Sequence, residues 1–361
     1  MEKIKYSIKE RSEKVHLPEN LGFGIHYTDH VFEMNYDPEK GWHSPEIKPI
    51  EKLAIHPAAM FIHYAQTIFE GLKAFKTANG EVVTFRADKH FERFNNSARK
   101  VCIPEMDKEF MLHALTELLS VESDWIPTGE GESLYIRPVL FGSDEFLGVR
   151  PSNSYKLIIL LSPVGAYYAE GFQPVKILVQ DDYVRAVRKG LGDCKTGANY
   201  AASLMAGRKA KEQGFTQVLW LDAIEQKYLE EVGTMNIFVQ FKDEVATPQL
   251  NGTVLPGVTR ASVIQILKDR GMNVSERLIS IDEVISEYKK GNVVSVFGTG
   301  TAAVISPVGV LSYKGFEMKF DYSSQNALAI ELFNEISGIQ RGEIEDRYNW
   351  LIHVDKKGVE V

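Results

Sequence analysis

Cysteine is scarce in this sequence: among 361 residues, only Cys102 and Cys194 occur. Two cysteines cannot form the disulfide framework of a small secreted domain, and they are typical of proteins from a reducing compartment. Long apolar runs are also lacking, because the longest aliphatic stretch, Leu157 to Leu161, is far shorter than the roughly 20 apolar residues of a membrane span. The charged start MEKIKYSIKERSEK has no apolar signal core. We therefore expect a cytoplasmic protein without a membrane segment.

Basic clusters are missing as well. The chain has 41 Lys and Arg residues against 49 Asp and Glu, a net charge of −8, and no block of five or six basic residues. Nothing therefore supplies the positive surface that nucleic-acid binding requires. The hydrophobic fraction of 44% and the charged fraction of 25% are those of an ordinary globular protein. Its length predicts about two domains.

Motifs for metal and acyl-enzyme chemistry are absent from the sequence. There is no H-E-x-x-H, no Cys-x-x-Cys and no G-x-S-x-G. His26 and His30 have a spacing that could bind a metal on a helix, but Gly24 and strand-like neighbours favour ordinary surface or core histidines. No metal site is predicted.

Apolar residues alternate between strand-like runs and helical spacing along most of the chain, which predicts a mixed α/β fold. The segment 162–174 (SPVGAYYAEGFQP) interrupts this pattern with Pro and Gly, so we expect a small N-terminal domain at 1–161, an interdomain loop at 162–174 and a large C-terminal domain at 175–361. The expected strands are 60–64, 82–86, 133–140, 156–161, 175–180, 217–222, 236–241, 293–297 and 302–305. The expected helices are 87–101, 107–121, 200–213, 258–270, 281–290 and 323–336.

A lysine flanked by glycines lies in the irregular segment GLGDCKTGANY, between a predicted strand and a predicted helix. Lys195 could simply be an exposed loop lysine. It could also form an imine with a carbonyl compound, which requires a pKa below the usual value of about 10.4 so that the amine is neutral. The segment alone leaves both interpretations open.

Three other segments could take part in binding. Glu230 and Glu231 lie in LEEVGTMN, directly before an apolar strand. One of the two carboxylates could pair with a protonated heteroaromatic nitrogen. The alternation of side chains along a strand does not say which one. The segment LPGVTR opens a predicted helix, and FGTGTA follows a predicted strand. Both can bind a phosphate through backbone N–H groups and hydroxyls, but each can equally be a plain turn.

Taken together and in order, these segments resemble the branched-chain amino-acid aminotransferase family of fold-type IV pyridoxal-phosphate (PLP) enzymes. The likeness covers nearly the whole chain. It rests on FGIHYTDHVFEMNYDPEKGW, LYIRPVLFGSDEFLGVRP, SPVGAYY, GDCKTGANY, QVLWLD, EVGTMNIFV, LPGVTR and FGTGTA.

The resemblance implies a role for each matched cofactor residue. Lys195 would carry PLP as a Schiff base and then move the substrate proton. Tyr200 would donate a hydrogen bond to the phenolic oxygen of the cofactor, and Glu231 would pair with the pyridine nitrogen. The phosphate would be bound by residues from three segments, namely Arg93, Val258, Thr259 and Thr301.

The resemblance also implies a substrate pocket and a homodimer. The matched pocket positions are mainly aromatic, which suits apolar side chains: Phe23, Tyr64, Phe69, Tyr135, Arg137, Tyr167, Thr234 and Ala302. Leu147 to Val149 would close the pocket of the other subunit. The implied reaction transfers an amino group between leucine, isoleucine or valine and 2-oxoglutarate.

Other functions remain compatible with parts of the pattern. A D-amino-acid aminotransferase or an aminodeoxychorismate lyase would keep Lys195, Glu231 and Arg93, but the match through EVGTMNIFV and SPVGAYY argues against both. A PLP-binding protein without turnover would not need a base next to the substrate carbon. An unrelated α/β protein with simple Gly-rich turns is the remaining alternative.

Overall fold

The computed structural model describes residues 2–10, 15–165, 173–322 and 327–355. The chain forms two compact units, of which the first contains residues 1–169, 195–197 and 338–361. The second contains residues 170–194 and 198–337. Both units combine helices with a nine-stranded sheet, so the predicted mixed α/β class is confirmed.

The first unit is built on one sheet, most of whose neighbouring strands are antiparallel. Its strands, in spatial order, are β1 (Lys5–Tyr6), β3 (Gly41–Pro49), β2 (His30–Asp37), β8 (Tyr155–Val164), β7 (Ser133–Gly142), β5 (Leu72–Lys76), β6 (Val82–Phe85) and β18 (Leu351–Val354), and β4 (Thr67–Phe69) pairs with β7. Along β7, Leu134 and Ile136 belong to the hydrophobic core, whereas Tyr135 and Arg137 alternate with them. Because side chains alternate across a strand, Tyr135 and Arg137 project from the face opposite the core.

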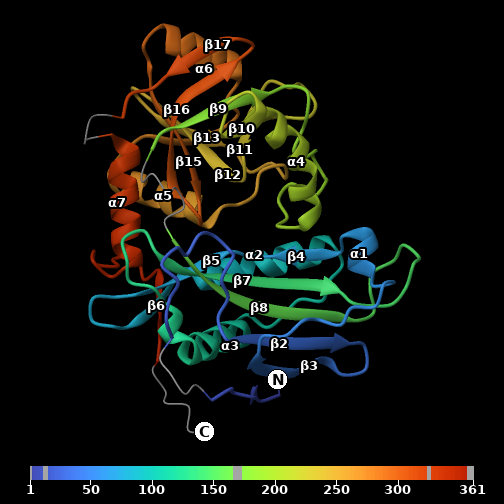
Figure 1. Cartoon of the computed structure of the whole chain (residues 1–361). Helices are drawn as coiled ribbons and strands as arrows, with labels where there is room; N and C mark the ends of the chain where they lie inside the picture. The colour runs from blue at the N-terminus through green and yellow to red at the C-terminus, as the bar shows by residue number, and fades with distance from the viewer. Residues whose placement is uncertain (1, 11–14, 166–172, 323–326, 356–361) are drawn as a thin grey trace. The chain divides into compact units, whose positions relative to one another are not determined.

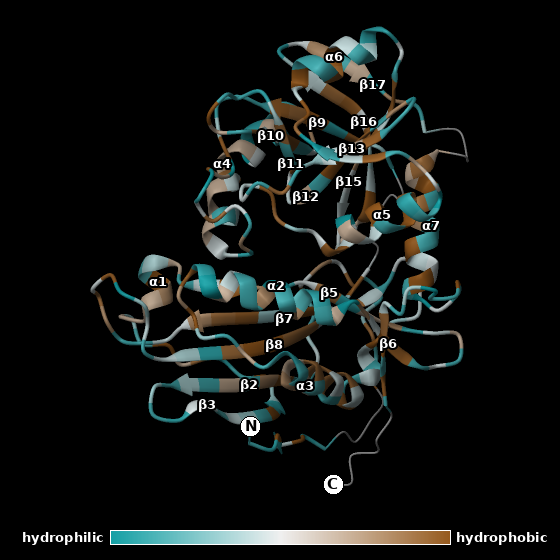
Figure 2. Cartoon of the chain, turned by 180° about the vertical axis from the view of Figure 1, so that it is seen from behind, coloured by the Kyte–Doolittle hydropathy of each residue, from teal (hydrophilic) through white to brown (hydrophobic). Residues whose placement is uncertain are grey.

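Helices α2 (Ala87–Lys100) and α3 (Lys108–Val121) supply the helical side of this core (Figure 1). In α2, the core residues Phe91, Phe94 and Ala98 follow the spacing of one helix face. The polar residues His90, Arg93 and Ser97 follow the same spacing one residue earlier, and they are buried too. Figure 2 shows the corresponding change between hydrophobic and hydrophilic residues along α2. The helix therefore carries a buried polar stripe beside its core stripe.

Two short helical segments complete the first unit: α1 (Met60–Tyr64) and the 3-10 helix at Ser123–Trp125. The prediction of a strand at 60–64 was wrong, because a short run such as MFIHY fits one turn of helix as well as a strand. The C-terminal residues also differ from the expected division at 175, since β18 pairs with β6 and residues 338–361 belong to the first unit. The first unit likewise extends beyond 161, because β8 continues to Val164.

The second unit contains a sheet that closes on itself. Its strands, in spatial order, are β11 (Leu229–Val232), β10 (Gln217–Leu221), β9 (Val175–Gln180), β16 (Val304–Tyr313), β15 (Val293–Gly300), β12 (Met235–Phe241), β13 (Val245–Pro248) and β14 (Val274–Arg277), and β17 (Phe316–Lys319) pairs with β16. Strand β11 pairs with β12 as well as with β10, which makes a ring of the strands from β11 to β12. Ala302 lies in the turn between β15 and β16, so the strand expected from residue 302 begins at Val304.

The remaining helices follow the predicted order along the second half of the chain. They are α4 (Gly197–Glu212), α5 (Val258–Asp269), α6 (Ile281–Lys289) and α7 (Leu328–Gln340). Helix α6 begins where a serine side chain caps it, because Ser280 Oγ accepts a hydrogen bond from the Glu283 N–H at 3.0 Å. In the described part of the chain, no helix has the length and apolar character needed to cross a membrane.

Candidate active site

Lys195 belongs to the first unit, where backbone hydrogen bonds fix its position. Its N–H donates to Ser97 Oγ on α2 at 3.0 Å, and its carbonyl accepts from the Phe69 N–H at 3.0 Å. The next residue, Thr196, donates its hydroxyl to the Thr67 carbonyl at 2.7 Å. The lysine is therefore tied both to α2 and to β4.

Aromatic rings surround the Lys195 side chain. Its Nζ lies 4.8 Å from the centroid of the Phe69 ring, and the Arg137 guanidinium lies 4.7 Å from the same centroid. Arg137 also donates to the Tyr135 hydroxyl at 2.9 Å, and the Phe23 ring meets the Tyr135 ring edge-on at 5.0 Å. Four of the predicted substrate residues thus lie around the predicted lysine.

Burial, together with the neighbouring positive charge of Arg93, lowers the pKa of Lys195 to about 8, while the Glu70 carboxylate opposes this change. At pH 7, about a tenth of such a side chain is a neutral amine, far more than for a free lysine. A neutral amine is the form that attacks a carbonyl carbon. This environment favours the imine-forming interpretation over an ordinary loop lysine.

Arg93 lies on the buried polar stripe of α2 and contacts Glu70. Its Nε donates to Glu70 Oε1 at 2.7 Å and its Nη2 donates to Glu70 Oε2 at 2.8 Å. His90 Nδ1 lies 2.8 Å from the same Oε2. The sequence analysis missed Glu70 and His90. The three-residue spacing of His90 and Arg93 could have placed them on one helix face, but Glu70 had no such signal.

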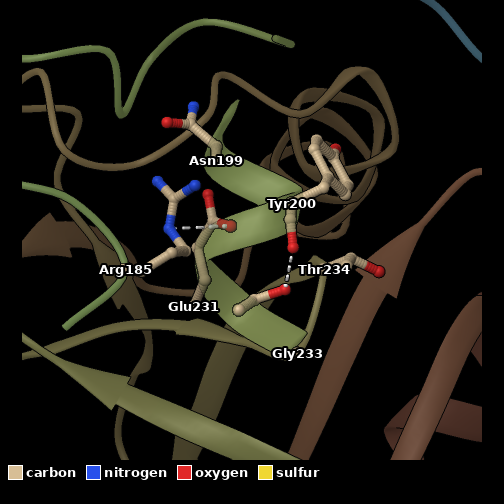
Figure 3. A pocket seen from close by; sticks show the side chains of 7 residues that line it. Arg185, Asn199, Tyr200, Glu231, Gly233 and Thr234 are labelled. Atoms are coloured by element: carbon tan, nitrogen blue, oxygen red, sulfur yellow. Dashed lines mark hydrogen bonds and ion pairs between the residues drawn. The ribbon is translucent and has the colours of Figure 1, made fainter. Parts of the chain in front are cut away.

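In the second unit, three predicted residues line one pocket, namely Tyr200 of α4, Glu231 of β11 and Thr234. Figure 3 shows them with the other lining residues: Arg185, Asn199, Ser203 and Gly233. Its lining combines the Arg185 and Glu231 charges with the hydroxyl groups of Tyr200, Ser203 and Thr234. It therefore suits a ligand with both hydrogen-bonding groups and charge.

Glu231 is held in this pocket by one backbone hydrogen bond and one ion pair. Its Oε1 accepts from the Leu255 N–H at 2.6 Å, and its Oε2 lies 3.3 Å from Arg185 Nε (Figure 3). Arg185 also donates through Nη2 to the carbonyls of Gly192, at 2.8 Å, and of Thr253. Sequence analysis missed Arg185, which no recognised motif contains.

Glu230 has a different environment from Glu231. Both of its oxygens are buried, and within the described chain neither accepts a hydrogen bond of normal geometry. Burial raises the pKa of Glu230 to about 7, although the nearby Thr253 hydroxyl and the charge of Arg185 oppose the rise. The alternation of β11 turns the two side chains to opposite faces, and Glu231 is the one that lines the pocket.

The predicted phosphate residues of the second unit lie at the start of α5 and after β15. Val258 and Thr259 form the first turn of α5, where a helix favours an anion. A Cβ at Gly257 would lie 1.9 Å from Asn236 Oδ1, so only glycine fits directly before this helix. Thr301 and Ala302 lie in the turn after β15, and α5 packs against β15.

Tyr64 and Val149 are two further predicted substrate residues. The Tyr64 hydroxyl donates to the Leu147 carbonyl, and Val149 in the same loop is 84% exposed. Tyr167 lies outside the described residues. Across the described ranges, no group of three or more His, Cys, Asp or Glu side chains could hold a metal ion.

Comparisons with known proteins agree on one family. The family Amino-transferase class IV matches residues 67–310. Branched-chain-amino-acid aminotransferase 2 of Bacillus subtilis is 50% identical over 337 residues, covering 93% of each chain.

Solved structures show the same fold. The branched-chain aminotransferase of Escherichia coli superposes with a TM-score of 0.76 at 27% identity, covering 91% of this chain and 100% of that one. The T.th. branched-chain aminotransferase, solved in complex with N-(5'-phosphopyridoxyl)-L-glutamate, has a TM-score of 0.73 at 25% identity, with coverages of 91% and 100%.

These findings confirm the predicted family and the fold-type IV architecture. The family match takes in more than half of the chain, including the lysine segment and the strand that carries Glu231. The relatives are matched along almost their whole length. This protein therefore belongs to the class IV aminotransferases.

Proposed function

We propose that this protein is a branched-chain amino-acid aminotransferase, which exchanges an amino group between leucine, isoleucine or valine and 2-oxoglutarate. The observation that carries the proposal is the environment of Lys195, a half-buried lysine with a pKa of about 8 that lies against the Phe69 ring. Relatives that match over nearly their whole length bear this name.

The residues that the resemblance assigns to PLP have the chemistry to hold it. Arg93, the first turn of α5 (Val258 and Thr259) and Thr301 would hold its phosphate. Glu231 would pair with the pyridine nitrogen, and Tyr200 would donate to the phenolic oxygen. Tyr200 is five residues from Lys195, so the chain keeps their backbones within about 18 Å of each other. When bound, the cofactor supplies the electron sink that allows a proton to leave the substrate carbon.

Lys195 would then hold and return that proton. A lysine with a pKa of about 8 is a moderate base near neutral pH, which suits reversible proton transfer. The Glu231 carboxylate accepts from the Leu255 N–H and forms an ion pair with Arg185, and it would face the cationic ring.

An apolar substrate side chain would contact Phe23, Phe69 and Tyr135, while Arg137, Thr234 and Ala302 would complete the pocket. The rings offer burial without leaving a polar group unpaired. Arg137 is covered by two rings, which lowers the cost of its charge beside an apolar substrate.

We also propose a homodimer. Tyr64 is 42% exposed, Leu147 61% and Val149 84%, which is high for three neighbouring apolar or aromatic side chains on one unit. A second copy would cover them, and in the family resemblance this loop closes the partner's pocket. Free Cys102 and Cys194 fit a cytoplasmic location.

One experiment tests cofactor, base and substrate together. The visible absorption of the purified protein is recorded before and after adding L-leucine and then 2-oxoglutarate, and borohydride reduction is followed by peptide mapping. We expect a band that leucine bleaches, that 2-oxoglutarate restores and that reduction fixes on Lys195. A band that D-leucine bleaches equally well would contradict the substrate proposal, and a protein that takes up no PLP would contradict the cofactor.

A further inference from the structure

Glu70 is a fully buried carboxylate at the junction of β4 and β5, with 0% of its surface exposed. Its Oε1 accepts from Arg93 Nε, and its Oε2 accepts from Arg93 Nη2, from His90 Nδ1 and, at 3.2 Å, from the Gly71 N–H. The side-by-side pairing with one edge of the guanidinium is the arrangement in which Arg and a carboxylate bind most directionally. Glu70 therefore orients Arg93 as well as balancing its charge.

The backbone of Glu70 is fixed from both sides. Its N–H donates to the Pro138 carbonyl at 2.9 Å, and the preceding residue, Phe69, donates to the carbonyl of Lys195. The following residue, Gly71, presses against β7, because a Cβ there would lie 2.0 Å from the Tyr135 hydroxyl. The carboxylate thus has a rigid base, connected by short backbone links to Lys195.

The charges of the cluster agree with this arrangement. Burial alone would raise the pKa of Glu70, but the charge and hydrogen bonds of Arg93, with those of His90, hold it well below the usual range. Burial lowers the pKa of His90 and outweighs the Glu70 carboxylate, which raises it. At neutral pH, Glu70 is therefore an anion, Arg93 is a cation and His90 is a neutral imidazole whose Nδ1–H donates to Glu70.

We propose that Glu70, supported by His90, is a positioning residue for phosphate recognition by Arg93. It holds the guanidinium by its Nε–Nη2 edge, and so fixes the direction of Nη1 before the cofactor arrives. This inference rests on the proposed function, in which Arg93 binds the phosphate of PLP. The role is distinct from packing, because a displaced Arg93 harms the phosphate contact and leaves the cofactor ring untouched.

The test compares PLP with pyridoxal, which has the same ring and aldehyde but no phosphate. Glu70→Asp keeps the charge and withdraws the carboxylate by one methylene. The cofactor is removed from the full-length protein, and dissociation constants are measured by the visible absorption of each ligand. We expect the PLP constant to rise about tenfold and the pyridoxal constant to change less than about twofold.

Glu122→Asp is the matched control, because Glu122 is another fully buried glutamate that contacts a buried histidine, His30, in the same unit. It should leave both dissociation constants unchanged. A second control places Glu70→Asp in an Arg93→Gln background. If Glu70 acts through Arg93, the substitution then adds no further selective loss for PLP.

Equal losses for PLP and pyridoxal, or no loss for either, would overturn the positioning role while leaving the proposed function intact. If wild-type protein bound no PLP, the proposed function itself would fail. Should Glu70→Asp not fold, His90→Gln removes the third contact to Oε2 and should weaken PLP about two- to fivefold with the same selectivity. An unselective result for that variant would equally refute the proposal.

Discussion

The first unit contains two buried glutamate–histidine pairs that use the same groups differently. Glu122 follows the last turn of α3 and contacts His30 Nδ1 on β2, and His30 Nε2 accepts from the Lys9 N–H at 3.0 Å. Glu122 Oε2 also accepts from the Asp29 N–H at 3.3 Å. In this pair, both nitrogens of the imidazole have a backbone or carboxylate partner.

The pair of Glu70 and His90 includes a cation in addition. Arg93 occupies two positions on the carboxylate, and the cluster lies beside the backbone of Lys195. A glutamate–histidine pair by itself joins segments of the fold, as Glu122 joins α3 to β2. With Arg93 added, the Glu70–His90 pair holds a guanidinium group that can bind an anion. The difference predicts that one pair affects ligand binding and the other affects stability alone.

The largest loss of activity should come from a substitution of Lys195, which lies beside the Glu70–His90 pair. Lys195→Arg keeps the positive charge, but a guanidinium stays protonated and cannot condense with an aldehyde. We expect leucine-dependent glutamate formation to fall by at least about a thousandfold. The measurement is the initial rate with saturating PLP, with folding checked by circular dichroism.

Glu122→Gln provides the comparison for this prediction. It alters a buried pair of similar chemistry and should keep the rate within about twofold wherever the protein stays folded. A Lys195→Arg variant with more than a tenth of the normal rate would show that another residue serves as the base.

The next largest effect concerns stability of the cofactor-free protein. Glu70→Gln leaves the buried Arg93 without its counter-charge, which typically costs about 3–5 kcal/mol. Glu122→Gln weakens the contacts of a carboxylate with His30 and with the Asp29 N–H, so we expect a smaller loss of about 1–3 kcal/mol. Urea denaturation of both variants, without phosphate in the buffer, measures the difference.

Inorganic phosphate should separate the two variants further. Glu122→Gln keeps the Glu70 carboxylate that orients Arg93, so phosphate should raise its denaturation midpoint more than that of Glu70→Gln. Equal responses of the two variants would mean that Glu70 does not position Arg93 for an anion.

Ordered motifs and the family that they resemble pointed to the candidate site residues of both units. Lys195, Tyr200 and Glu231 each lie in a short motif whose order along the chain is informative, and the structure assigns Tyr200 and Glu231 to one pocket. Strand alternation alone left Glu230 and Glu231 open, the family resemblance selected Glu231, and in the structure Glu231 is the one of the two that lines the pocket.

Long-range pairing explains what sequence patterns missed. Glu70 contacts Arg93 across 23 positions, and Arg185 meets Glu231 through a contact that no motif spacing encodes. The same applies to β18, which pairs with β6 near the other end of the chain and so brings the C-terminal segment into the first unit. Such contacts depend on the finished fold, and no local periodicity records them.

Glu230 completes the comparison as a buried glutamate of the second unit with neither histidine nor arginine bonded to it in the described chain. Burial raises its pKa from 4.5 to about 7, the opposite direction to Glu70. Between these values the folded protein keeps a proton that the unfolded chain has released. Stability from this group therefore falls as pH rises from about 4.5 and levels off above about 7.

Glu230→Gln removes this titration, so its stability relative to wild type should increase between about pH 5 and pH 8 by about 2 kcal/mol. Any cost of burying the amide is the same at both pH values, so the change with pH isolates the ionisation. Denaturant titrations of both proteins at pH 5 and pH 8 measure this change in the stability difference directly. If the stability difference between Glu230→Gln and wild type stayed constant with pH, Glu230 would remain in one protonation state over this range. A charged partner or water would then satisfy its carboxylate. In that case a glutamate of this fold could be buried without the histidine partner that Glu70 and Glu122 both have.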